Sequence, residues 1–464
     1  MAAANIAPVN DKREIFGWTM YDWANSAFST TVVTVFLGPY LTSVAEAAAN
    51  ADGFLNVLGL SIRFDSFFTY CVSLSVALQV FILPVLGAIA DYSHLRKRML
   101  VLFAVLGSVA TLLMFFIVPG LHLFGGLLLV LANLSFGASI VFYNAYLPDI
   151  ATPDQRDRVS SAGFAMGYAG GGLLLLLNLL MFLFQDNLGL DSALVARLSL
   201  VSAGVWWLGF ALITFARLRS RHAPRPLPAG ETLLSVGFKQ LGHTLSEIRR
   251  FPQTVRYLVA YLFFNDGIQT VIVVSAIFAA EELGMDATSR ILVILMIQIV
   301  AFGGAYFYGW LAGRIGTLRA LILSLVIWSA VVVYAFAGMT STAQVLGMEQ
   351  RHLEFWLLAF VVAIVLGGSQ ALSRSLFSQM IPPGREAEFF SFYEISERGT
   401  SWIGPFLFAV VNDRFGSLRF GILSVIVLFI VGLAILLTVN VRRAIAEAGH
   451  VGVVPTNREA AAAD

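Results

Sequence analysis

The segment WTMYDWANSAFSTTVVTVFLGPY, residues 18–40, carries a single charged side chain, Asp22. A helix needs about 20 mostly apolar residues to cross the roughly 30 Å hydrocarbon layer of a bilayer. Inside that layer the backbone amides must be satisfied within the segment, which a helix achieves. Residues 18–40 therefore predict a transmembrane helix.

Segments of this kind recur along the whole chain of 464 residues, of which 58% are hydrophobic and 12% charged. Soluble domains carry about 25% charged residues, so a water-soluble globular protein is excluded. The sequence predicts an all-α integral membrane protein. Its twelve expected spans are residues 18–40, 67–90, 99–118, 122–147, 160–184, 194–216, 254–280, 291–312, 318–338, 355–380, 389–411 and 420–439.

The longest loop divides the expected spans into two groups of six. We expect an N-terminal bundle at residues 1–216, a linker at 217–253, a C-terminal bundle at 254–440 and a disordered cytoplasmic tail at 441–464. The linker spaces apolar side chains as an amphipathic helix does, at Leu234, Phe238, Leu241, Leu245 and Ile248. Such a helix is typical of the lipid headgroup surface, and a regulatory partner site is the alternative.

The two halves of the chain echo each other. Tyr21 and Asn25 of the first span recur 240 residues later as Tyr261 and Asn265 of the seventh. Two further correspondences, at the ends of spans 2 and 8 and near the starts of spans 5 and 11, occur in the same order. Duplicated halves are typical of transporters, whose sites lie between corresponding helices. The sequence thus predicts two pseudo-symmetric six-helix bundles.

Basic residues predict the orientation. Of the 29 Lys and Arg residues, 22 lie on the side of the two termini and 6 on the other, and Arg398 falls within a span. The positive-inside rule places the termini in the cytoplasm. A net charge of +1 provides no basic field for nucleic acid. We expect a monomer in a bacterial plasma membrane, although a vacuolar membrane also fits.

Several strings resemble a known family. GAIADYSHLRKR (residues 87–98) looks like the loop signature of the major facilitator superfamily. More specifically, the chain resembles the UMF1 or vacuole effluxer Atg22-like family in YDWANSAFSTTVVT (21–34), YNAYLPDIATPDQRDRVS (143–160), FFNDGIQTVIVV (263–274) and GGSQALSRSLFSQMIPPGREAEFF (367–390). The resemblance implies the major facilitator fold, alternating access and, as in the yeast vacuolar member, export of amino acids.

The loop after span 2 supplies the candidate gating residues Gly87, Asp91 and Arg96. Gly87 permits a close helix approach. Asp91 can receive an arginine or the N-terminus of a neighbouring helix in one conformation only, which biases the transport equilibrium. The alternative for Arg96 is a charge that only sets the topology.

Two polar stripes within the membrane are candidates for a substrate cavity. Asp22 and Asn25 lie on one face of span 1. In span 7, Asp266 and Gln269 have the same i, i+3 spacing, and Asn265 lies next to Asp266. A charge at the centre of a spanning helix costs about 2.5–3.5 kcal/mol, so such residues mark pathways or paired sites. The alternative for Asp22 is a position close to the cytoplasmic end, where it caps the helix or pairs with a loop arginine.

Four further charges fall in spans 10 and 11. Arg374 can fork onto a substrate carboxylate or snorkel to the headgroups. Glu394 is a cavity candidate, but its i, i+4 spacing to Arg398 also suits an intrahelical ion pair. Glu397 and, in span 7, Asp266 are then the candidates for proton coupling.

These features predict a secondary transporter that moves a small polar or zwitterionic solute by alternating access. Protons are the candidate coupling ion, and we expect no cofactor, metal or enzymatic activity. The six His residues are scattered without the spacing of metal ligands. A lipid or lysolipid flippase of the same fold is the alternative, and an integral-membrane enzyme is a more distant one.

Overall fold

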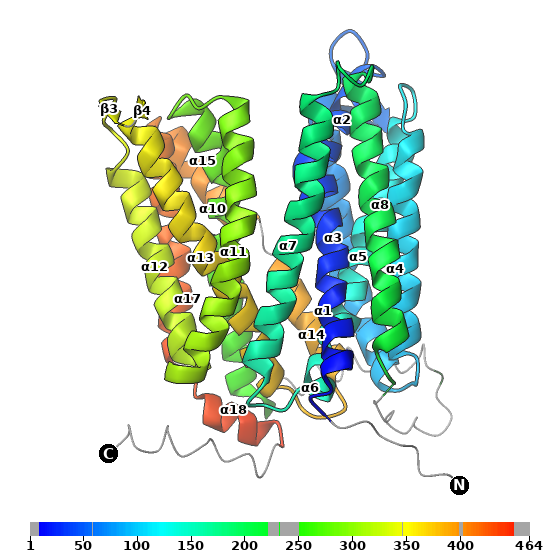
Figure 1. Cartoon of the computed structure of the whole chain (residues 1–464), viewed down its shortest axis with the longest axis vertical. Coiled ribbons are helices and arrows are strands. Elements are labelled where there is room, and N and C mark those ends of the chain that lie inside the picture. The colour runs from blue at the N-terminus through cyan, green and yellow to red at the C-terminus, as the bar shows by residue number, and fades with distance from the viewer. Residues whose placement is uncertain are drawn as a thin grey trace.

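The computed structural model describes residues 9–57, 59–220, 232, 250–345, 347–398 and 402–449, which form two helical bundles side by side (Figure 1). The elements of the first half are α1 (Lys12–Ala27), η1 (Phe28–Phe36), α2 (Leu37–Glu46), β1 (Phe54–Val57), β2 (Leu60–Arg63), η2 (Phe64–Ser66), α3 (Phe67–Asp91), α4 (Arg96–Leu113), η3 (Met114–Phe116), α5 (His122–Asn144), α6 (Leu147–Ile150), α7 (Arg156–Leu183) and α8 (Ser192–Arg217). We call this half the N bundle.

The second half, the C bundle, begins after the linker. Its elements are α10 (Pro252–Glu281), α11 (Ala287–Ile315), α12 (Thr317–Ala337), β3 (Gln344–Val345), β4 (Met348–Glu349), α13 (Gln350–Gln379), α14 (Glu386–Arg398), α15 (Ile403–Phe415), α16 (Leu418–Ser424), α17 (Ile426–Leu437) and α18 (Val441–Glu447). The strands form two short antiparallel hairpins, β1–β2 and β3–β4.

The spans follow the hydropathy of the sequence. Within the described residues, eleven helical segments are long and apolar enough to cross a membrane. The first, Lys12–Glu46, runs through α1, η1 and α2, and η1 is a π-helix. The expected span at residues 389–411 corresponds to α14 and α15 instead, with residues 399–401 outside the described part. The chain therefore has the predicted all-α architecture of two six-helix bundles.

The start of α1 and the whole of α18 lie at the same end of the bundles (Figure 1). We call this end the terminal end. The expected disordered tail at 441–464 is wrong for its first part, because Val441–Glu447 form α18. Asn440 caps this helix by accepting a hydrogen bond from the Arg443 backbone N–H. The expected amphipathic helix of the linker lies outside the described residues.

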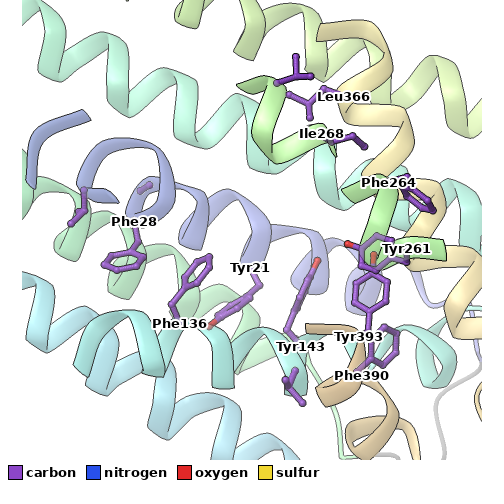
Figure 2. Close-up of a cluster of buried hydrophobic side chains, with 14 of the residues drawn as sticks. Tyr21, Phe28, Phe136, Tyr143, Tyr261, Phe264, Ile268, Leu366, Phe390 and Tyr393 are labelled. Carbon is purple, nitrogen blue, oxygen red and sulfur yellow. The ribbon is translucent and has the colours of Figure 1, made fainter. Parts of the chain in front are cut away.

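The bundles meet on two sides. On one side α7 of the N bundle packs against α11 and α13 of the C bundle, and on the other α14 packs against α3 and α5. One buried apolar cluster extends through both bundles and contains aromatic side chains from each, such as Tyr21, Phe136 and Tyr143 of the first and Tyr261 and Tyr393 of the second (Figure 2).

Within the C bundle, glycines let α11 and α13 approach closely. A Cβ atom on Gly304 would lie 2.5 Å from the backbone oxygen of Ile364, and one on Gly367 would lie 2.5 Å from that of Ala301. Both contacts are with backbone, which cannot move aside as a flexible side chain can. Small residues that bring backbones together are the usual basis of helix association in membranes.

We predict that Gly304→Leu destabilises the C bundle by about 1–3 kcal/mol, the usual cost of forcing extra volume into a packed contact. Gly303→Leu is the matched control, because a Cβ atom at Gly303 meets nothing within 4 Å. Thermal unfolding of the detergent-purified variants measures the effect. Equal melting temperatures for the two variants would contradict this account of the α11–α13 contact.

Candidate functional site

A buried ion pair joins the two bundles. Asp22 lies in α1 and Arg374 in α13, and the two nitrogens Nη1 and Nη2 of Arg374 each donate to Asp22 Oδ2 at 3.2 Å. The Tyr143 hydroxyl donates to the same oxygen at 2.7 Å. Asp22 is therefore not a helix cap, a role that belongs to Asp11 at the start of α1.

The other hydrogen bonds of the Arg374 guanidinium within the described residues also go to the N bundle. Its Nε donates to Ser160 Oγ at 2.9 Å, its Nη2 to the Ser160 backbone oxygen at 2.9 Å, and its Nη1 to Asn144 Oδ1 at 3.3 Å. Its side chain is 3% exposed. Arg374 therefore does not snorkel to the headgroups, and in this conformation its guanidinium is occupied by protein groups rather than open to a substrate carboxylate.

Three aromatic rings complete this enclosure. The guanidinium carbon of Arg374 lies 4.2 Å from the centre of the Phe164 ring, 4.8 Å from that of Trp18 and 5.5 Å from that of Tyr143. Each distance suits a cation–π contact. We call the group formed by Trp18, Asp22, Tyr143, Asn144, Ser160 and Phe164 the Arg374 box.

The predicted gating residues come together in a second cluster at the terminal end. Asp91, at the end of α3, accepts hydrogen bonds from the backbone N–H groups of Ala387 at 3.1 Å and Glu388 at 2.9 Å. These two groups lie in the first turn of α14, so the carboxylate meets the positive end of that helix dipole. A Cβ atom on Gly87 would lie 2.6 Å from the Ala387 oxygen, which shows how closely α3 and α14 approach.

Arg96 is the cation of this cluster, with a side chain only 3% exposed. Its Nη2 contacts Asp91 Oδ1 at 2.9 Å and Glu386 Oε2 at 2.8 Å, and its Nη1 contacts Asp149 Oδ2 at 2.8 Å. Burial disfavours the charged form of Glu386, but the Arg96 guanidinium outweighs this and holds the pKa of Glu386 below its ordinary value. Arg96 thus contacts carboxylates of both bundles and is more than a topological charge.

Further polar contacts cross between the bundles near these two clusters. The Thr317 hydroxyl, at the start of α12, donates to Asp157 Oδ2 of α7 at 2.6 Å. Arg156 Nη1 donates to the Ser378 oxygen at 2.9 Å, and the Ser160 hydroxyl to the Ala371 oxygen at 2.7 Å. Together with the two ion-pair clusters, these contacts close the terminal end of the molecule.

The ionisable groups at the far end of α14 lie further from the terminal end than the Arg96 cluster does. Arg398 is twelve residues beyond Glu386, or about 18 Å along a helix with a 1.5 Å rise, which places it near mid-membrane. Glu394 and Arg398 form the expected intrahelical ion pair. The Arg398 guanidinium carbon also lies 4.7 Å from the centre of the Phe136 ring in the N bundle.

Glu397 contacts α10, a helix of its own bundle. It accepts a hydrogen bond from the Tyr261 hydroxyl at 3.0 Å, and its backbone oxygen accepts one from Asn265 Nδ2 at 3.0 Å. At this level one hydrogen bond does cross between the bundles: the Tyr168 hydroxyl of α7 donates to Gln370 Oε1 of α13 at 2.6 Å. Tyr261, Asn265, Tyr168, Gln370 and the α14 charges thus form a polar layer above the Arg374 box.

Asp266 is not part of this layer, contrary to the expectation that it lines the cavity. Its Oδ2 accepts a hydrogen bond from the Gly404 backbone N–H at 2.8 Å, inside the C bundle. A Cβ atom on Gly404 would lie 1.9 Å from Thr270 Oγ1, so α15 packs directly against α10 here. Asp266 caps the N-terminus of α15, and Gln269, three residues further along, is half-buried.

Several buried polar atoms of α1, α10 and α14 lack a hydrogen-bond partner within the described residues, and three of them bear on the polar layer. They are Nδ2 of Asn25, Oδ1 of Asn265 and Oε2 of Glu394, and each residue is at most 3% exposed. Buried polar groups are nearly always paired, with protein, water or ligand. In the described residues, no group of three or more His, Cys, Asp or Glu side chains is placed to hold a metal ion.

The family model described as "Vacuole effluxer Atg22 like" matches residues 10–449. The chain belongs to this family. An uncharacterized transporter of the major facilitator type from Bacillus subtilis, YxiO, is 31% identical over 422 residues, which cover 90% of this chain and 93% of YxiO. Autophagy-related protein 22-1 of Penicillium rubens is 25% identical, over 93% of this chain and 90% of its own.

Solved transporters share the fold of this Atg22-like chain. A bacterial homologue of the iron transporter ferroportin, in an outward-facing state, has a TM-score of 0.64 at 13% identity over 92% of this chain and 98% of its own. The proton:xylose symporter XylE has a TM-score of 0.63 at 12% identity over 91% and 93%. These neighbours establish the twelve-helix major facilitator fold, and the protein is a transporter by family.

Sequence reasoning missed most of the groups that surround the charges. Ser160 and Phe164 of the Arg374 box, and Glu386 and Asp149 of the Arg96 cluster, carry no signal in a single sequence. Tyr143 and Asn144 lie at the end of α5, where polar side chains are common and do not by themselves indicate a site. An arginine inside a span already demands a carboxylate nearby, but the sequence offered four candidates and did not choose among them.

We predict that Arg374→Ala destabilises this closed conformation by about 3–5 kcal/mol, because it leaves the Asp22 carboxylate buried without its cation. The double variant Asp22→Asn/Arg374→Ala should recover part of this loss, since it removes the unpaired charge. Arg443→Ala is the control, because the Arg443 side chain is 65% exposed and its partner Glu447 lies on the same helix at i, i+4. Thermal unfolding that ranks Arg374→Ala with Arg443→Ala would contradict the role given to the pair.

Proposed function

We propose that this protein is a secondary transporter that moves a small polar or zwitterionic solute by alternating access between its two bundles. The observation that carries this proposal is the pair Asp22–Arg374, a buried contact between bundles that must break for the terminal end to open. The Arg96 cluster supports it, because Asp91 can hold the first turn of α14 only while α3 and α14 touch.

The distribution of basic residues supports an orientation with the terminal end in the cytoplasm. The conformation with a closed terminal end is then the outward-facing or occluded one. The Bacillus subtilis relative supports a bacterial plasma membrane.

The polar layer favours a solute with groups of both signs, such as an amino acid. Within the layer, Arg398 offers a cation and Glu394 and Glu397 offer carboxylates. Asn265 of the layer, and Asn25 of α1 outside it, offer amides with unpaired atoms. Because the unpaired atoms are buried, a solute that hydrogen-bonds to them recovers a penalty of roughly 1–3 kcal/mol each. An apolar solute would leave this penalty in place.

Proton coupling is proposed for Glu397 alone. Its carboxylate is half-buried beside Tyr261 and next to the pair Glu394–Arg398, so a proton there changes the charge of the polar layer. Asp266, the other candidate, is enclosed by α10 and α15 of one bundle and is further from a path between the bundles.

A lysolipid flippase remains the second candidate, because an apolar cavity of about 530 Å³ lies where α2, α7, α8 and α11 meet. Its lining consists mainly of Val35, Phe36, Leu175, Leu179, Phe182 and Ile291. Such a lining suits an acyl chain better than an amino acid. Ile291 belongs to the C bundle and the rest to the N bundle, so bundle movement would change this cavity.

A disulfide across the terminal end tests alternating access. In a Cys71→Ser background, Asp157→Cys/Thr317→Cys should form a disulfide upon oxidation, because the native side chains already touch. We expect uptake into proteoliposomes to fall at least tenfold and to recover with dithiothreitol. The probes are labelled leucine, lysine and glutamate, with labelled lysophosphatidylcholine for the second candidate.

The two single-cysteine variants, oxidised in the same way, are the controls. Undiminished transport by the cross-linked protein would contradict opening at the terminal end. Transport of lysophosphatidylcholine with no amino acid uptake would replace the first candidate solute by the second.

A separate variant tests the coupling proposal. Glu397→Gln keeps the hydrogen bond from Tyr261 and removes the exchangeable proton, so we expect it to lose uptake driven by a pH gradient and to retain solute exchange at equal pH. Both fluxes are measured in the same proteoliposomes, with Glu447→Gln on the surface helix α18 as control. Gradient-driven uptake at the native rate would assign coupling elsewhere.

A further inference from the structure

The Arg374 box is built entirely by one bundle and filled by the other. Trp18 and Asp22 come from α1, Tyr143 and Asn144 from α5, and Ser160 and Phe164 from α7, whereas Arg374 comes from α13. The box is a site for a cation, and in this conformation the cation is a side chain of the protein itself.

Contacts within the N bundle hold the box together without Arg374. The Trp18 indole Nε1 donates to the Tyr143 backbone oxygen at 2.9 Å, and the two rings stack with centres 4.4 Å apart at 15°. The Tyr143 hydroxyl donates to Asp22 at 2.7 Å. All three groups are buried, and none of these contacts depends on the C bundle. The box should therefore keep its shape when the bundles separate.

The composition of the box suits a guanidinium or a primary ammonium group. Aromatic faces and a carboxylate attract a cation, and Ser160 and Asn144 present oxygens that accept hydrogen bonds from it. Space is also provided: a Cβ atom on Gly163 would lie 2.5 Å from Asp22 Oδ2 and 2.8 Å from Arg374 Nη2. Any side chain at this position would fill the box.

Opening of the terminal end withdraws Arg374 and leaves the Asp22 carboxylate among aromatic rings. A buried charge without a partner is strongly unfavourable, so the open state requires a replacement. We propose that, when the terminal end opens, the Arg374 box binds the guanidinium or ammonium group of a solute from that side, in direct competition with Arg374. This inference rests on the alternating access proposed above and assigns the box as a cation subsite of the open state.

Competition has a measurable consequence. A ligand that binds only the open state shifts the population towards it by a factor of 1 + [L]/Kd. A small cation should therefore favour opening of the terminal end, and it should do so only while Asp22 is charged. A solute without a cationic group would lack this effect.

The first experiment asks whether the box binds a cation once Arg374 is removed. Full-length Arg374→Ala is titrated with ethylguanidinium, at low millimolar concentration, while thermal unfolding is followed. We expect a saturable rise in melting temperature that sodium chloride at equal ionic strength does not produce. Asp22→Asn/Arg374→Ala should require at least tenfold more ethylguanidinium, and Gly163→Ala/Arg374→Ala should likewise lose binding.

The second experiment keeps Arg374 in place. The Asp157→Cys/Thr317→Cys pair reports closure of the terminal end through its rate of oxidation. We expect ethylguanidinium to slow this rate at least threefold, and to have no effect after Asp22→Asn. Sodium at equal ionic strength is again the control.

The outcomes separate the two proposals. If the disulfide does not block transport, the proposed alternating access fails. If it blocks transport while ethylguanidinium neither binds Arg374→Ala nor slows oxidation, alternating access stands and the cation subsite is overturned. Equal binding with and without the Asp22 carboxylate also overturns the subsite, since a general effect of guanidinium on the protein would then explain the shift.

Discussion

Removing one member of a buried ion pair leaves the other as an uncompensated charge, which is strongly unfavourable. Asp22 and Arg374 meet this constraint across the boundary between two bundles, so one ion pair links electrostatics to the conformation of the whole molecule. The bundles cannot separate at the terminal end without exposing both charges to an environment that lacks their partners. Any opening movement must therefore provide new partners, and this requirement shapes what the transporter can bind.

The terminal end and the polar layer solve the problem of buried charge in different ways. At the terminal end, Arg96 contacts carboxylates of both bundles and Asp91 holds the start of α14, so these contacts require the two bundles to touch there. Nearer mid-membrane, Glu394 pairs with Arg398 on the same helix. A pair within one helix moves as a unit, so it can face a solute in every conformation and still avoid an unpaired charge.

The sequence predicts those features that depend on residues close to one another along the chain. Span positions follow from hydropathy, and the Glu394–Arg398 pair follows from its i, i+4 spacing. The partner of Arg374 does not, because Asp22 lies 352 residues away in the sequence. The polar stripe of span 7 also misled the assignment of Asp266: this residue lies between Asn265 and Gln269 in the sequence, yet it faces into its own bundle.

The position of Asp266 has a physical reason that only packing reveals. The helix α15 begins at Ile403, in the middle of the span expected at residues 389–411, so its first backbone N–H groups need acceptors within the protein. Asp266 supplies an acceptor to Gly404, and its negative charge suits the positive end of the helix dipole. The absence of a side chain at Gly404 allows α10 to come close enough for this contact. Asp266 stabilises the start of a helix within its own bundle, so it does not need a partner from the N bundle. The carboxylates that respond to bundle movement are those that pair across the two bundles, such as Asp22.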